Sequence, residues 1–197
     1  MTRRQTLAAC LAALGFGPAW HAVPTRARPA NDQWQQAVNL AALTVARLRR
    51  AAGRGFPGLI KSTTAILIAP NGNRADSLLL IRHDTGWGEP AFLSGSGLTT
   101  ARPTILLIRT ERALDEILHQ RGLTLSGPAE LTLAHITSRV PADILAWPGP
   151  DLSPDGFLQD DAANAAWYGL PRTAPEIVGA TPPDLRTSKL RAELSRK

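Results

Sequence analysis

The residue types that could carry out catalysis in this chain lie in settings that do not favour it. Ser96 stands between Gly95 and Gly97 and is the best placed nucleophile. The surrounding letters form neither the G-x-S-x-G elbow of serine hydrolases nor a complete G-x-G-x-x-G phosphate loop. We therefore interpret this serine as part of a tight bend or bulge in a strand. The sequence predicts a protein that is not an enzyme.

Possible metal ligands are scattered. His83, His119 and His135 are isolated rather than spaced as a metal-binding pair. A group of aspartates could offer oxygen ligands to calcium, but it lacks the glycine and the terminal glutamate of an EF-hand loop. This group comprises Asp151, Asp155, Asp160 and Asp161. We expect the last two to be first-turn acids at a helix N-terminus, where the helix dipole favours negative charge. We expect no metal and no cofactor.

Basic side chains are the third kind of candidate functional residue, and they could bind an anionic surface. The chain has a formal net charge of +6, and one group of basic residues lies near its end, from Arg186 to Lys197. The other group comprises Arg47, Arg49, Arg50, Arg54 and Lys61. Each basic residue near a negative membrane contributes about 1 kcal/mol, and guanidinium groups pair bidentately with phosphate. Arg49 and Arg50 are therefore the strongest candidates for lipid contact. The alternative is that this group only complements the negative end of a helix dipole.

The first 30 residues have the pattern of an export signal. Arg3 and Arg4 precede an apolar run, residues 7–16. The start resembles a twin-arginine signal, but Thr6 replaces the usual large apolar residue, so the general secretory route stays open. Cys10 lies near the beginning of the apolar run rather than after it, and we interpret it as signal core rather than as a lipid anchor.

Export determines which partners are plausible. Cleavage after Ala22, Ala27 or Ala30 would leave a periplasmic or secreted chain of about 170 residues, the size of one domain. Without Cys10 the mature chain has no cysteine, and therefore no disulfide and no thiolate. We expect no nucleic-acid partner, because the chain is exported and its aromatic residues form no stacking array.

Periodicity predicts an amphipathic helix over residues 32–52, beginning at Asn31 or Asp32. Its apolar positions recur at steps of three and four residues: Trp34, Val38, Ala41, Ala42, Val45 and Leu48. That face could lie at a lipid headgroup boundary. We favour the alternative that it packs on a sheet, where the two alanines allow close approach.

Short apolar runs separated by turn residues predict strands in the rest of the chain. The expected strands are residues 64–69, 77–81, 91–93, 104–108, 123–125, 131–136 and 144–147. Thr110 and Asp160 are expected to begin two short helices, the second ended by Gly169. The sequence thus predicts an α+β fold with a mainly antiparallel sheet or partly closed barrel, an N-terminal amphipathic helix and two short helices. Residues 31–180 would form the domain and residues 181–197 a basic, flexible tail.

Three segments, residues 86–92, 94–98 and 160–169, resemble the SYLF family of lipid-binding domains. The motif residues are Trp87, Pro90, Phe92, Gly95, Gly97, Asp160, Asp161, Asn164, Trp167, Tyr168 and Gly169. The chain departs from the family in the shortened stretches between Ala69 and Leu78 and between Trp147 and Phe157.

The resemblance implies an exported, non-enzymatic domain that binds anionic phospholipid headgroups at a membrane surface. Some eukaryotic relatives bind phosphoinositides, and fungal members bind actin. We do not transfer actin binding to a chain that leaves a bacterial cytoplasm. The alternative is a structural or protein-interaction module of the cell envelope, without lipid specificity.

Overall fold

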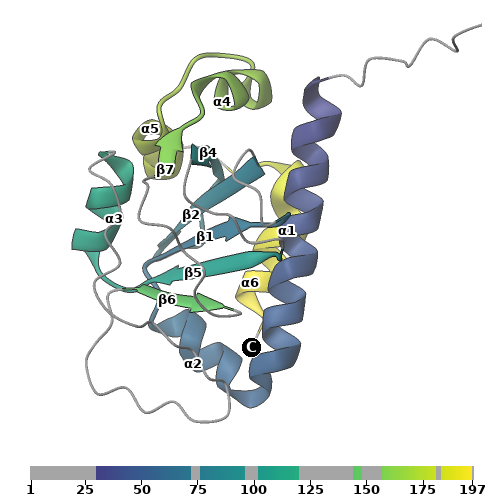
Figure 1. Cartoon of the computed structure of the whole chain (residues 1–197), viewed down its shortest axis with the longest axis vertical. Coiled ribbons are helices and arrows are strands. Elements are labelled where there is room, and N and C mark those ends of the chain that lie inside the picture. Colours follow the sequence, from purple (N-terminus) through teal and green to yellow (C-terminus); the bar gives the residue numbers. More distant parts are fainter. Residues whose placement is uncertain are drawn as a thin grey trace, which may run out of the picture.

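The computed structural model describes residues 30–71, 76–95, 102–119, 144–147, 157–180 and 183–196 (Figure 1). Several sequence-based predictions lie outside these residues. They concern the export signal with Cys10, the strands at 123–125 and 131–136, His135, Ser96, Gly97, Asp151 and Asp155.

An open antiparallel sheet forms the middle of the molecule. Its strands are β1 (Ala65–Ala69), β2 (Ser77–His83), β3 (Gly86–Trp87), β4 (Ala91–Gly95), β5 (Thr104–Ile108), β6 (Ile144–Trp147) and β7 (Phe157–Gln159). In the described part of the chain their order is β6-β5-β1-β2-β4-β7, with β3 paired to β2, and every pair is antiparallel. The predicted α+β class with an antiparallel sheet is confirmed. Among the described residues the sheet is open, which is the first of the two predicted alternatives, rather than a partly closed barrel.

Helices cover both faces of the sheet (Figure 1). They are α1 (Ala30–Ala52), η1 (Gly53–Gly55), α2 (Phe56–Lys61), α3 (Glu111–Leu118), α4 (Asp161–Tyr168), α5 (Ala174–Ala180), η3 (Leu185–Thr187) and α6 (Ser188–Ser195). Apolar side chains of α1, α2, α4 and α6 form a core with one face, and those of α3 and α5 form a second core with the other. Both faces of β1 and β5 are therefore buried, which explains their continuous apolar sequences.

The apolar face of α1 packs on the sheet. Val38, Val45 and Leu48 are each at most 1 % exposed. Trp34 is partly buried against the same core, and its ring centroid lies 5.0 Å from that of Phe92. The packing alternative for this helix is confirmed. The apolar side chains that a membrane would need are already used inside the protein.

The two short helices that the sequence predicts begin at their expected caps. The Ala113 N–H donates to the Thr110 hydroxyl oxygen at 3.3 Å, and the Ala163 N–H donates to an Asp160 carboxylate oxygen at 2.9 Å. Gly169 ends α4 with φ of 74°, a left-handed conformation that favours glycine. Both predicted N-caps and the predicted end of the second helix at Gly169 are confirmed.

The predicted flexible tail is instead an ordered part of the fold. Leu190 and Leu194 of α6 are at most 1 % exposed and join the core that α1 forms with the sheet. The two apolar positions of this helix stand among charged residues, so its sequence does not show the pattern of a packed helix. Two positions four residues apart suffice to bury one face of a two-turn helix. Helices α2 and α5 were also not predicted.

Candidate functional site

Two of the motif segments meet at Asn164. This side chain is fully buried on α4 and pairs with the backbone of β4. The Phe92 N–H donates to its Oδ1 at 2.8 Å, and its Nδ2 donates to the Phe92 carbonyl oxygen at 3.2 Å. The amide thus takes the place of a neighbouring strand for one residue. Nearby, the Tyr168 hydroxyl donates to the Pro90 carbonyl oxygen at 2.7 Å.

Aromatic rings pack around the same contact between α4 and β4. Phe92 lies between Trp34 and Trp167, with ring centroids 5.0 Å and 5.6 Å away. Trp87 is 6 % exposed and belongs to the same core. Trp167 is 2 % exposed, so it anchors α4 and offers no surface platform for a lipid or a sugar ring. The buried motif residues hold the fold together rather than face a ligand; they are Trp87, Phe92, Asn164 and Trp167.

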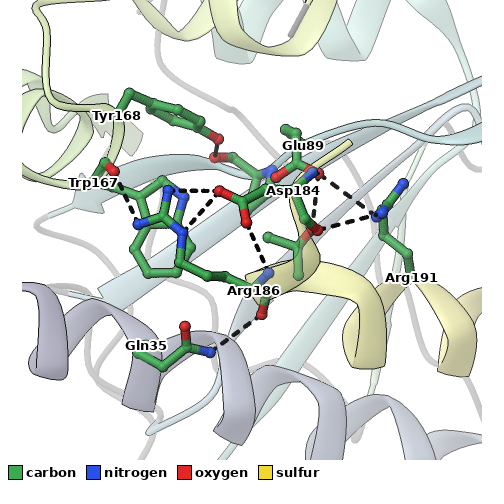
Figure 2. Close-up of polar contacts among 9 residues, drawn as sticks. Gln35, Glu89, Trp167, Tyr168, Asp184, Arg186 and Arg191 are labelled. Atoms are coloured by element: carbon green, nitrogen blue, oxygen red, sulfur yellow. Dashed lines mark hydrogen bonds and ion pairs between the residues drawn. The ribbon is translucent and has the colours of Figure 1, made fainter. Parts of the chain in front are cut away.

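Glu89 is a buried carboxylate that sequence analysis did not single out (Figure 2). It lies between β3 and β4 and is 1 % exposed. Its Oε1 accepts hydrogen bonds from the Asp184 N–H and the Thr187 hydroxyl, both at 2.8 Å. The Arg191 Nε lies 3.6 Å from the same oxygen. A lone acid between Gly88 and Pro90, inside an otherwise apolar segment, was the available signal.

Arg186 connects the C-terminal segment with α4 (Figure 2). Its Nε and Nη2 lie 2.8 Å and 2.6 Å from an Asp184 carboxylate oxygen, and its Nη1 donates to the Trp167 carbonyl oxygen at 3.1 Å. The guanidinium also lies 4.0 Å from the Trp167 ring centroid, a cation–π contact. The hydrogen bond from Arg186 lowers the pKa of Asp184. This arginine serves the fold, although the sequence places it in a basic group.

The buried Glu89 makes stability depend on pH. Burial raises its pKa above the ordinary value of 4.5, against the opposing effect of its hydrogen bonds and Arg191. Between the unfolded and folded pKa values the native state binds more protons, so stability falls as pH rises through that window. We expect Glu89→Gln to remove this slope, because the amide oxygen can still accept both hydrogen bonds but nothing titrates. Urea unfolding at a series of pH values checks this.

A second variant tests the cause of that slope. Thr187→Val removes one donor to the charged carboxylate, so it raises the Glu89 pKa further and should widen the pH range over which stability falls. Parallel pH curves for the wild type and Glu89→Gln would contradict the assignment.

The structure separates the predicted basic residues into two kinds. Arg49 donates from Nη2 to a Glu193 carboxylate oxygen at 2.9 Å, and Arg196 lies 3.5 Å from the other oxygen of the same carboxylate. Arg49 thereby links α1 to α6, whereas the sequence indicated it as one of the strongest candidates for lipid contact. The remaining residues of the group, namely Arg47, Arg50, Arg54 and Lys61, are exposed.

The exposed basic residues share one end of the molecule. Arg47 and Arg50 lie in the last turns of α1, Arg54 follows in η1, and Lys61 ends α2, which turns back beside α1 (Figure 1). The sequence contains no acidic residue between Asp32 and Asp76. Acidic side chains that could neutralise this end must therefore come from elsewhere in the chain. Glu193 is one, and it is paired with Arg49.

The described residues offer neither a metal-binding group nor a membrane-spanning helix. They contain no group of three or more histidine, cysteine, aspartate or glutamate side chains that could hold a metal ion. None of the helices within them is long and apolar enough to cross a membrane. Comparisons with protein families, with curated proteins and with solved structures found no match to this chain.

Proposed function

We propose that this protein is an exported, non-enzymatic domain that associates with anionic lipid headgroups at a membrane surface. One observation carries the proposal. Four exposed basic side chains, Arg47, Arg50, Arg54 and Lys61, extend from three consecutive elements at one end of the molecule. The resemblance of residues 86–92, 94–98 and 160–169 to SYLF domains favours the same class of ligand.

The spacing of these residues suits a flat, charged partner. Arg47 and Arg50 are three residues apart on α1, which places them on neighbouring turns of one face. Their long apolar stems let the charged groups reach outward. At about 1 kcal/mol for each basic residue, four would contribute about 4 kcal/mol at low salt, and screening within a Debye length would weaken this as salt rises. The binding should be peripheral and reversible.

Co-sedimentation with vesicles tests the proposal. The protein should bind vesicles of phosphatidylcholine mixed with phosphatidylglycerol, bind less at moderate salt, and ignore phosphatidylcholine alone. Arg47→Glu combined with Arg50→Glu should abolish binding. Arg50→Glu alone should weaken binding. Lys189→Glu is the matched control for this single reversal, because Lys189 is exposed on the first turn of α6, outside the basic end. Arg49 should be left unchanged, since its reversal would place two carboxylates together at Glu193.

Two results would contradict the proposed binding to anionic lipid headgroups. One is equal binding to neutral and anionic vesicles, and the other is no binding to either. A partner protein captured equally by the wild type and by the double reversal would then favour the interaction module, with the basic residues serving only the helix end.

A further inference from the structure

The sheet places two more arginines beside the basic end, from positions far apart in sequence. Ala65 of β1 stands opposite Ile81 of β2 and Ile108 of β5. The next position on each strand forms a row of Arg82, Thr64 and Arg109. The Arg82 N–H donates to the Thr64 carbonyl oxygen at 2.8 Å, and the Thr64 hydroxyl donates to the Arg109 carbonyl oxygen at 3.1 Å.

The three side chains of this row start from the same face of the sheet. Residues two positions further in, namely Ile66, Leu80 and Leu107, belong to the core beneath α1 and α2. Because side chains alternate along a strand, Thr64, Arg82 and Arg109 continue that face beyond the core. Arg82 confirms the direction, since its Nη1 donates to the carbonyl oxygen of Ile60 in α2, next to Lys61, at 3.0 Å.

The row has donors available for a ligand. Arg82 is exposed, and the Nε of Arg109 is buried with no hydrogen-bond partner among the described residues. With β1 between them, the two arginine backbones lie about 10 Å apart, near enough for their long side chains to converge on one group. Two guanidinium forks match the oxygens of a phosphate, whereas the Thr64 hydroxyl already donates its proton to the Arg109 carbonyl oxygen. Glu111, an acid close in sequence, lies on α3, which packs on the opposite face.

We propose that Arg82 and Arg109, on either side of Thr64 and with Lys61 beside them, form a subsite for a phosphate monoester. If the monoester is a lipid headgroup, the subsite rests on the proposed function and extends the basic end around α2. The same chemistry also suits a free phosphate. The proposal distinguishes this row from Arg47, Arg50 and Arg54, which would supply only general attraction to negative charge.

Exchange of arginine for lysine separates geometry from charge. Vesicles carrying phosphatidic acid, a monoester, are compared with vesicles carrying phosphatidylglycerol, a diester, at matched surface charge. The wild type should bind the monoester more tightly. Arg109→Lys and Arg82→Lys should each lower that preference about fivefold, the equivalent of about 1 kcal/mol, while leaving phosphatidylglycerol binding in place. Arg50→Lys is the matched control and should leave the preference unchanged.

A free-ligand titration distinguishes the source of the phosphate. Glycerol 3-phosphate should shift the Arg109 Nε–H resonance in a saturable way in the wild type, and more weakly in Arg82→Lys. Thermal unfolding checks that Arg82→Lys, which alters the contact with Ile60, stays folded.

The outcomes are distinct for the two proposals. No saturable shift, together with the wild-type lipid preference in Arg109→Lys, overturns the subsite while salt-sensitive vesicle binding still supports membrane association. A saturable shift without vesicle binding overturns membrane association and assigns the subsite to free phosphate.

Discussion

Deleting residues 184–197 is expected to unfold the domain. The deletion removes Leu190 and Leu194, which are buried against α1 and the sheet. Full burial of a leucine contributes about 1.5 to 3 kcal/mol, so the pair accounts for about 3 to 6 kcal/mol. The deletion also removes the Asp184 N–H and the Thr187 hydroxyl, and a buried carboxylate without its donors costs more. The sum approaches the whole stability of a typical domain, about 5 to 15 kcal/mol.

Urea unfolding followed by circular dichroism measures this loss. The truncated protein should show no cooperative transition, or one shifted to much lower urea. Deleting only Arg196 and Lys197 is the control, since Arg196 is exposed at the end of α6 and its loss should change little. A truncated protein that unfolds at the wild-type urea concentration would support the flexible tail that the sequence suggests, against the packed helix.

Asn164→Ala is expected to destabilise the domain by about 2 to 4 kcal/mol. The substitution leaves the Phe92 N–H unpaired at a fully buried site, which costs about 1 to 3 kcal/mol. It also removes one of the two hydrogen bonds to the Phe92 carbonyl oxygen, a loss of about 0.5 to 1.5 kcal/mol, while the bond from the Asp160 N–H remains. Water could recover part of this only by entering the aromatic cluster around Phe92. The effect should appear in the free energy of unfolding from urea denaturation, with an unchanged m-value.

Asn39→Ala provides the matched control. Asn39 is exposed on α1, and its side chain accepts only a long hydrogen bond of 3.4 Å from Gln35. Its replacement should stay within about 0.5 kcal/mol of the wild type. Equal effects at the two positions would mean that the buried amide of Asn164 contributes nothing specific.

Local patterns in the sequence identified much of the fold, and contacts between distant residues account for what they missed. The face of α1, the buried strands β1 and β5 and the cap at Asp160 follow from spacing and composition within a few residues. The strands β3 and β7 span only two and three residues, too short for alternation to appear. The role of α6 depends on α1, which lies far away in sequence.

In the candidate site, too, some features follow from the local sequence and others depend on contacts between distant residues. Exposed basic residues near the end of α1 could be listed from the sequence, but the partner of Arg49 is Glu193, 144 residues away. A salt bridge of that span leaves no local signal. The alignment of Arg82 and Arg109 on either side of Thr64 depends on strand register, which becomes visible only once the sheet order is known.

The docking of α6 against α1 has a consequence for how the chain folds during synthesis. Gln35 donates a hydrogen bond to the Arg186 carbonyl oxygen across 151 residues, and Arg49 pairs with Glu193 across 144. At about 5 to 20 residues per second, the ribosome finishes α6 many seconds after α1 has emerged. During that interval the apolar face of α1 lacks one of its covers, and contacts of such long range also form slowly. We therefore expect the nascent chain to stay incompletely folded until α6 has emerged from the ribosome, a state that chaperones can bind.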